Sequence, residues 1–307
     1  MSEPYDSIII GAGTAGMTAG VYAARENLHA VLLEKHLPGG QAALTARIEN
    51  YPGFPEGISG YDLMERMRKH ASDFGLEFRN AEVTAIHKHH HLFTVDTTAG
   101  ELTARSIIIS TGVRPRRLGI PGEQEFFGRG VSTCATCDGA FFKGMEVAVI
   151  GGGDSAVEEG IFLTRFASMV HVIHRREQFR AIRSLTHKAS ENPRIKFHLN
   201  TTVISINGSR TVESLTLKNT IDGKEWTLPV SGVFLYIGLV PNSELFRGFV
   251  DLNNQGFIVV DQQLAASLPG TFAAGDVRDT PLRQVITAAS DGALAAYSAG
   301  RYLENVQ

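Results

Sequence analysis

The sequence repeats one glycine-rich unit, and this repeat restricts the possible folds more than any other feature. The first copy is Gly11-x-Gly13-x-x-Gly16, and the second, Gly151-x-Gly153-x-x-Ala156, begins 140 residues later. An apolar run precedes each copy, starting at Tyr5 and Val147, and a helical pattern follows it. A strand, a glycine turn and a helix in this order form the dinucleotide-binding unit. We therefore expect an α/β protein with two nucleotide sites.

The second strand of each unit ends in residues of opposite charge. Glu34 ends the strand of the first unit, whereas His174, Arg175 and Arg176 follow that of the second. An acid at this position binds an unmodified ribose hydroxyl, and a basic cluster suits a 2′-phosphate. The pattern predicts FAD or NAD in the first unit and NADPH in the second. The alternative interpretation of the arginines is a solvated helix start.

Composition excludes several classes of protein. A length of 307 residues suggests about two domains. A net charge of −3 indicates no general attraction to nucleic acid or to an anionic membrane. The longest apolar runs are strand-sized, and the N-terminus lacks the pattern of a signal peptide. We expect a cytoplasmic protein with neither nucleic acid nor membrane as a partner.

Two stretches rich in proline and glycine, Gly112–Gly122 and Gly238–Asn242, bracket the second unit. They predict an inserted domain, with boundaries at 1–115, 116–240 and 241–307. The periodicity also predicts an amphipathic helix over Tyr61–Phe74 and a C-terminal helix from about Arg283 to Glu304.

The two cysteines, Cys134 and Cys137, are separated by two residues just before the second unit. This spacing suits a redox-active disulfide. A structural zinc site would need four ligands, and histidines could supply the rest. The histidine cluster His87 and His89–His91 more often marks a solvated hairpin end. Asp138 is a candidate general acid–base, or else an ordinary turn aspartate.

Together these motifs resemble the low-molecular-weight, bacterial-type thioredoxin reductases, a group of pyridine nucleotide-disulfide oxidoreductases, over essentially the whole chain. The segments that carry the resemblance are Cys134-Ala135-Thr136-Cys137-Asp138-Gly139, Gly151–Glu159, His174–Arg176 with Arg180, Gly39–Gln41, Glu49-Asn50, Thr111-Gly112 and Ala273–Asp276. The resemblance implies two Rossmann-like, three-layer domains, with the NADPH domain inserted into the FAD domain. It also implies a homodimer and an electron route from NADPH through FAD and the disulfide to thioredoxin.

Residue roles follow position by position from the resemblance. Cys137 is the thiol nearest the flavin, Cys134 attacks the disulfide of the partner protein, and Asp138 transfers a proton. The implied FAD-binding residues are Gly11, Gly13, Thr14, Ala15, Gly16, Glu34, Lys35, Gly40, Gln41, Asn50, Val83, Thr111, Gly112, Gly275, Asp276, Arg283, Gln284 and Val285. The implied NADPH-binding residues are Gly151, Gly153, Asp154, Ser155, Ala156, His174, Arg175, Arg176 and Arg180.

The sequence departs from the family pattern in two places near the implied flavin ring. Leu282 replaces an aromatic residue, and Ser290-Asp291 replaces a segment that usually contains glycine. These changes bear on flavin affinity or potential, not on the electron route.

Two other functions compete with the leading one. A reductase of a different small dithiol protein would carry the same motifs, since carrier choice depends on surface shape. A redox-sensing or metal-binding module that uses Cys134 and Cys137 as ligands would lack a bound flavin.

Overall fold

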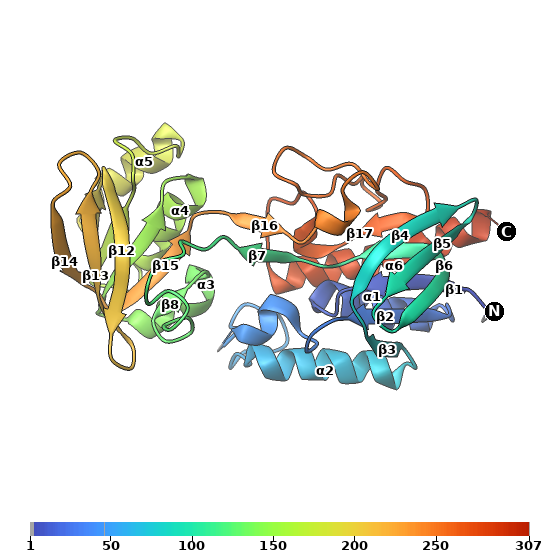
Figure 1. The fold of residues 1–307 in the computed structure, drawn as a ribbon. Coiled ribbons are helices and arrows are strands. Elements are labelled where there is room, and N and C mark those ends of the chain that lie inside the picture. The colour runs from blue at the N-terminus through green and yellow to red at the C-terminus, as the bar shows by residue number, and fades with distance from the viewer. Residues whose placement is uncertain (1–2, 46, 307) are drawn as a thin grey trace. The chain divides into compact units, whose positions relative to one another are not determined.

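The computed structural model describes residues 3–45 and 47–306, which form two compact units (Figure 1). Unit 1 consists of Met1–Arg114 and Val240–Gln307, and unit 2 consists of Pro115–Leu239. Unit 2 is therefore an insertion between two halves of unit 1. Both units combine a parallel sheet with helices, which agrees with the predicted α/β class.

The sheet of unit 1 has the strand order β3-β2-β1-β6-β5-β4, and β17 also pairs with β6. Strands β1, β2, β3, β6 and β17 pair in parallel, whereas β4 and β5 form an antiparallel hairpin that joins β6. Their bounds are β1 Tyr5–Ile10, β2 Ala30–Glu34, β3 Glu77–Asn80, β4 Val83–His89, β5 Leu92–Thr97, β6 Gly100–Ile109 and β17 Thr271–Ala273.

Three helices accompany this sheet, α1 (Thr14–Arg25), α2 (Gly60–Asp73) and α6 (Val285–Asn305). Alanine and glycine dominate the facing sides of α1 and α6, so the two helices pack closely. A Cβ on Gly292 of α6 would lie only 2.1 Å from the carbonyl oxygen of Ala15 in α1. Ser59 caps α2, because its hydroxyl accepts a hydrogen bond from the Asp62 N–H at 3.0 Å.

In unit 2 the parallel sheet has the order β11-β10-β9-β15-β8. Helices α3 and α4 pack on one face through Val147, Val149 and Phe234, and the antiparallel sheet β12-β13-β14 covers the other face. This arrangement gives three layers. The bounds are β8 Val131–Ser132, α3 Ala135–Asp138, β9 Glu146–Gly151, α4 Asp154–Leu163, β10 Met169–Ile173, α5 Arg183–Ser190, β11 Ile195–His198, β12 Thr201–Gly208, β13 Val212–Asn219, β14 Glu225–Pro229 and β15 Gly232–Tyr236.

The chain crosses between the units twice, in β7 (Val113–Pro115) and β16 (Leu239–Pro241), and these two strands pair with each other. Both lie within the proline- and glycine-rich stretches that the sequence marks as linkers. Short 3-10 turns complete the described elements: η1 Gly40–Leu44, η2 Gly139–Phe142, η3 Glu244–Phe246 and η4 Gly275–Val277.

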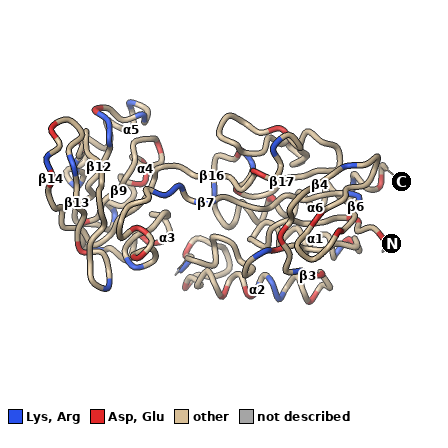
Figure 2. The backbone as a smooth tube through the Cα atoms, viewed as in Figure 1, with Lys and Arg blue, Asp and Glu red and all other residues tan. Residues whose placement is uncertain are grey.

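Acidic and basic residues are interspersed along both units (Figure 2). Within residues 3–45 and 47–306, no helix is long and apolar enough to cross a bilayer.

Candidate active site

Cys134 and Cys137 form a disulfide in unit 2, with their Cα atoms 5.3 Å apart. Cys134 is the N-cap of α3, a single helical turn, and Cys137 lies inside that turn. Both cysteines are half-buried. The turn brings Cα atoms three residues apart into the range that a disulfide needs. The predicted redox pair is therefore joined and partly exposed to solvent.

Three side chains and backbone groups hold the disulfide turn in place. The Cys134 N–H donates to Ser132 Oγ at 3.0 Å, and the Ser132 hydroxyl donates to Asp138 Oδ2 at 2.6 Å. The Ala135 N–H donates to the Tyr236 hydroxyl at 2.6 Å. Asp138, the predicted proton carrier, is thus fixed one residue from Cys137 by a buried serine.

Burial sets the electrostatics around the disulfide. It raises the pKa of Asp138, and the hydrogen bond from Ser132 opposes this effect. It also raises the pKa of Glu159 in α4 to about 7, with a further contribution from the charge of Glu158. Glu159 Oε2 is buried and has no hydrogen-bond partner among the described residues. Burial therefore raises the pKa of two carboxyl groups in the unit that carries the disulfide.

The second glycine fingerprint lies between β9 and α4. A Cβ on Gly152 would meet the ring of buried His174 at 2.2 Å, so this position accepts only glycine. Gly153 is the N-cap of α4, and no atom lies within 4 Å of where its Cβ would be. This open space at a helix N-terminus suits a pyrophosphate. Ala156 is buried against the sheet, while Asp154 and Ser155 are exposed at the helix start.

The basic segment after β10 is tied to this fingerprint. The N–H of Arg180 donates to the Gly152 carbonyl at 2.7 Å, and the Ile182 N–H donates to Asp154 Oδ1 at 2.8 Å. Arg175, Arg176 and Arg180 are exposed. His174 differs from them, because its ring is buried and stacks on Phe179 with centroids 5.4 Å apart. Burial lowers the pKa of His174, so it supports the loop as a neutral ring.

The first fingerprint has the same construction in unit 1. A Cβ on Gly16 would lie 1.9 Å from the Gly11 carbonyl oxygen, so glycine is needed for α1 to pack on β1. Gly13 is the N-cap of α1, and nothing lies within 4 Å of its Cβ position. Glu34 Oε2 accepts a hydrogen bond from the Ala12 N–H at 2.8 Å. The acid predicted to bind ribose is thus held beside the open glycine.

Other predicted FAD-binding segments gather around this turn. Gly40 begins η1 close to Gly13, since its Cβ position is 3.4 Å from the Gly13 Cα. Gly275 begins η4 beside α1, with its Cβ position 3.0 Å from the Ala15 Cβ. Thr14 and Gln41 lie in these same elements. Residues separated by more than 200 positions in the sequence therefore meet at one edge of the sheet.

The remaining predicted FAD-binding residues lie on loops and helix ends of unit 1. Asn50 Nδ2 donates to Oε1 of Gln284, the N-cap of α6, at 3.0 Å, and Val285 is the first residue of that helix. The Thr111 hydroxyl donates to the Asn242 carbonyl at 2.6 Å, next to Gly112.

Lys35 directly follows Glu34, and its ammonium group pairs with Glu82 at 3.0 Å. Val83 follows Glu82 as the first residue of β4. Lys35 therefore directly follows β2, and Val83 begins the strand that comes after β3.

Two charged groups of this set have unusual surroundings. Burial raises the pKa of Asp276 to about 6, although Arg283 opposes this shift. The Arg283 guanidinium stacks over Phe257 at 4.5 Å, and its Nε is buried without a partner among the described residues. An unpartnered buried donor close to Asp276 is consistent with a site for an anionic cofactor such as a flavin nucleotide.

Asp291, one of the departures from the family pattern, has a structural partner. Arg278 donates to both of its carboxylate oxygens, at 2.6 and 2.8 Å, and the Gly275 N–H donates to Oδ2 at 3.0 Å. This buried, bidentate pair fixes η4 and so the position of Asp276. The other departure, Leu282, is about half exposed before α6.

Sequence reasoning did not identify Ser132, Tyr236 or the buried carboxyl group of Glu159 as parts of the site. Tyr236 reaches the disulfide turn only through the fold, from β15, whereas Ser132 of β8 lies two residues before Cys134. Glu159 lies inside the quoted fingerprint, and its position as the sixth residue of a helix that packs on the sheet is the one signal that the sequence offered.

His87 and His89 lie in β4 and His90 lies in the turn before β5, so the histidine cluster is at a hairpin end, as predicted. Among the described residues, no group of three or more His, Cys, Asp or Glu side chains is arranged to hold a metal ion.

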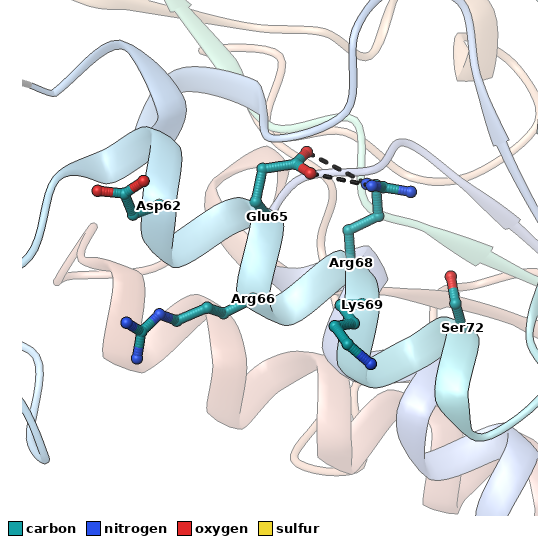
Figure 3. Close-up of a pocket in the computed structure, with 6 residues that line it drawn as sticks. All are labelled: Asp62, Glu65, Arg66, Arg68, Lys69 and Ser72. Carbon is teal, nitrogen blue, oxygen red and sulfur yellow. Dashed lines mark hydrogen bonds and ion pairs between the residues drawn. The ribbon is translucent and has the colours of Figure 1, made fainter.

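A shallow pocket lies on the exposed side of α2 (Figure 3). Its lining residues are Asp62, Glu65, Arg66, Arg68, Lys69 and Ser72. Glu65 pairs with Arg68 at 2.9 Å, and Lys69 pairs with Asp73 at 2.6 Å. Because one solvated helix face supplies the whole lining, we assign it no part in the chemistry.

Comparison with known proteins identifies the family. The sequence matches the family described as pyridine nucleotide-disulphide oxidoreductase over residues 5–292. Thioredoxin reductase of Listeria innocua is 46% identical over 304 residues, which cover 99% of this chain and 95% of the relative. Thioredoxin reductase of Bacillus subtilis is 46% identical over 312 residues, which cover 100% and 98%.

The solved structure of thioredoxin reductase from Streptococcus pyogenes matches with a TM-score of 0.91 at 42% identity, covering 98% of each chain. This similarity confirms the predicted fold of two Rossmann-like domains and the family resemblance drawn from the motifs. The chain belongs to the pyridine nucleotide-disulphide oxidoreductases and, within them, to the thioredoxin reductase family.

Proposed function

We propose that this chain is an NADPH-dependent, FAD-containing enzyme that reduces the disulfide of thioredoxin. The observation that carries the proposal is the Cys134–Cys137 disulfide, which is framed by Ser132 and Asp138 in the unit that also holds the basic nucleotide loop. The overall reaction is NADPH + H⁺ + thioredoxin disulfide → NADP⁺ + thioredoxin dithiol. Bound FAD would accept two electrons from NADPH and deliver them to the disulfide.

The residues of the disulfide turn carry out the thiol–disulfide exchange and the proton transfer. Once the pair is reduced, the Cys134 thiolate attacks one sulfur of the thioredoxin disulfide, and the other sulfur leaves as a thiolate. Cys137 then attacks Cys134 and releases the second thioredoxin thiolate. Asp138, whose raised pKa favours a bound proton, supplies a proton to the departing sulfur. Ser132 keeps that carboxyl group pointed at the turn.

The charged residues of each unit decide which cofactor we assign to it. Unit 1 would hold FAD over Gly13 and beside Glu34, with the unpartnered Arg283 Nε as a further donor. Unit 2 would hold NADPH over Gly153, with Arg175 and Arg176 directed to the 2′-phosphate. The predicted domain boundaries, 1–115, 116–240 and 241–307, belong to this assignment. A homodimer and a cytoplasmic location complete the proposal and rest on the family resemblance.

The test is NADPH-driven reduction of a panel of thioredoxins and other small dithiol proteins by the purified protein. We expect a bound flavin spectrum and fastest turnover with a thioredoxin. A preference for another dithiol carrier would mean that this carrier is the substrate, while the electron route within the protein would stay as proposed. A protein without flavin that binds metal through Cys134 and Cys137 would contradict the proposal.

The cysteine variants test the route itself. Cys134→Ser and Cys137→Ser should each abolish thioredoxin reduction, because the dithiol can no longer form. Both variants should keep FAD and its reduction by NADPH, as followed by the loss of flavin absorbance. Ser132→Ala is the matched control, since it keeps both thiols and should retain measurable turnover. Thioredoxin reduction near the wild-type rate in either cysteine variant would show that the assigned route is wrong.

A further inference from the structure

Tyr236 contacts the disulfide turn from a distant part of unit 2. It is the last residue of β15, and its hydroxyl accepts the Ala135 N–H at 2.6 Å. Ala135 follows Cys134 directly and is 1% exposed. The first amide inside the Cys-x-x-Cys turn is therefore bonded to a side chain 101 residues later in the sequence.

This bond acts together with the serine and aspartate on the other side of the turn. Ser132 binds the Cys134 N–H and the Asp138 carboxylate, so it joins the residues before and after the turn. Tyr236 adds a hydrogen bond that links the sheet to the middle of the turn. Its own position is fixed, because its backbone pairs with Gly151 at the end of β9 and its ring packs on the core of the sheet.

Reduction changes what the turn must accommodate. Once the S–S bond is broken, the two sulfur atoms move apart to at least van der Waals contact, and the turn must relax. A hydrogen bond made in the closed turn resists this relaxation, because its donor, a buried amide, would lose its partner. Any interaction that is stronger in the disulfide form than in the dithiol form shifts the equilibrium toward the disulfide.

We propose that Tyr236 is a positioning residue that holds the Cys-x-x-Cys turn in its closed geometry and thereby makes the Cys134–Cys137 dithiol a stronger reductant. The inference deepens the proposed function, since it rests on these cysteines being a redox pair. The hydroxyl remains neutral, because burial and the nearby charge of Glu159 raise the pKa of Tyr236. It is thus a constant acceptor for the amide.

The test compares the disulfide equilibrium of the flavin-loaded wild type and of Tyr236→Phe in glutathione redox buffers. Two glutathione thiols reduce the protein disulfide, their protons pass to Cys134 and Cys137, and glutathione disulfide forms. Alkylation followed by mass spectrometry counts the protein thiols at each buffer ratio. We expect the equilibrium to shift toward the dithiol by about three- to tenfold in Tyr236→Phe, because one hydrogen bond of the closed form is lost.

Two further variants make the result specific. A 2,3-difluorotyrosine at position 236 keeps the ring and the hydroxyl but weakens the oxygen as an acceptor, so it should give an intermediate shift. It also keeps the test available if the phenylalanine variant does not fold. Tyr297→Phe removes a hydroxyl from an exposed residue of α6 in unit 1 and should leave the equilibrium unchanged.

An equilibrium within about twofold of the wild type in both position-236 variants, or a shift toward the disulfide, would overturn the proposal. A fall in thermal stability without a change in the equilibrium would assign Tyr236 a structural role only. The equilibrium is measured without thioredoxin or NADPH. Failure of the proposed function would therefore appear as absent thioredoxin turnover in the wild type, which is a separate result.

Discussion

At the scale of single residues, Asp138 shows a conflict between stability and chemistry. Burial raises its pKa in the folded protein above the value of the unfolded chain. The folded state therefore binds a proton more strongly, and stability falls as the pH rises from the unfolded pKa through the folded one. At neutral pH the charged carboxylate destabilises the fold, and its role in the site explains why it is nevertheless present.

Asp138→Asn should therefore stabilise the flavin-loaded protein at pH 7.5 by about 0.5–2 kcal/mol while slowing thioredoxin reduction. The asparagine oxygen still accepts the Ser132 hydroxyl, so the turn keeps its frame. Urea unfolding and steady-state turnover measure the two effects. Asp251→Asn, at an exposed loop position, is the control that should change neither. A variant that is both less stable and fully active would contradict this account.

Arg175 and Arg176 determine the choice of coenzyme in the same proposal. Charge-assisted hydrogen bonds to a phosphate contribute about 1.5–3 kcal/mol each. The double variant Arg175→Gln/Arg176→Gln should raise the KM for NADPH at least about tenfold and leave the KM for NADH nearly unchanged. Steady-state kinetics with both coenzymes measure this difference. Arg210→Gln, an exposed arginine elsewhere in unit 2, is the control. Equal losses with NADPH and NADH would assign the arginines another role.

At the scale of elements, a polar chain crosses the parallel sheet of unit 2. Glu146 of β9 binds His171 Nε2 of β10 at 2.9 Å, and His171 Nδ1 lies 3.0 Å from His198 Nε2 of β11. His171 is buried, whereas Glu146 reaches solvent. Burial, followed by the charges of His171 and Lys196, lowers the pKa of His198 to about 4.

This network predicts a loss of stability in mild acid. The unfolded chain takes up a proton on His198 near pH 6.5, and the folded protein does so only near pH 4. Stability at this site is therefore present above pH 6.5 and lost as the pH falls toward 4. Between pH 7.5 and 5 the wild type should lose about 1–2 kcal/mol more than His198→Gln. Urea unfolding at the two pH values measures the difference.

The control for this effect is His91→Gln, which changes an exposed histidine of the hairpin in unit 1. It should follow the wild type at both pH values. If His198→Gln lost as much stability as the wild type on acidification, the network would not be the source of the pH dependence.

The elements also show how far the sequence alone can predict this protein. Apolar runs and glycine turns predicted β1, α1, β9 and β10 closely, because their signals are local. The helix after the second fingerprint ends at Leu163, and single turns follow it. The C-terminal helix begins at Val285 and not near Arg283, because Gln284 and Thr287 form a capping box.

What the sequence could not predict depends on contacts between distant segments. α5 is only eight residues long and mostly polar and exposed, so it was not expected. The sequence around Tyr236 is typical of the end of a buried strand. Nothing near it in the chain indicates that its hydroxyl accepts a hydrogen bond from the Cys-x-x-Cys turn. The residue types at the site were predictable from motifs. The long-range hydrogen bond that supports the disulfide turn became visible only in the folded structure.

At the scale of the whole molecule, the insertion means that the two proposed cofactor sites belong to different units. The disulfide and the basic loop belong to unit 2, and the first fingerprint belongs to unit 1. In the proposed reaction the flavin must meet both the nicotinamide and the disulfide, and thioredoxin must also reach the disulfide. One small ring cannot serve these partners in a single arrangement. The reaction therefore requires the units to alternate between arrangements.

The two crossover strands, β7 and β16, are the candidate hinges. Gly112 precedes β7 with φ of +65° and Gly238 precedes β16 with φ of +113°, so each crossover has a residue that can absorb backbone rotation. On the side of unit 1, Arg114 donates to Asn242 Oδ1 at 2.7 Å and also pairs with Glu244. Rotation is thus expected next to the glycines and not within the paired strands.

Single-molecule energy transfer tests this expectation directly. Dyes are placed on cysteines that replace Ala99 in unit 1 and Asp222 in unit 2, both exposed turn residues, while Cys134 and Cys137 are protected in their disulfide. Excess unlabelled protein prevents two labelled chains from pairing. We expect two transfer efficiencies whose proportions change when NADPH is added, because reduction and nucleotide binding favour different arrangements. One unchanged efficiency during active turnover would show that the units do not alternate.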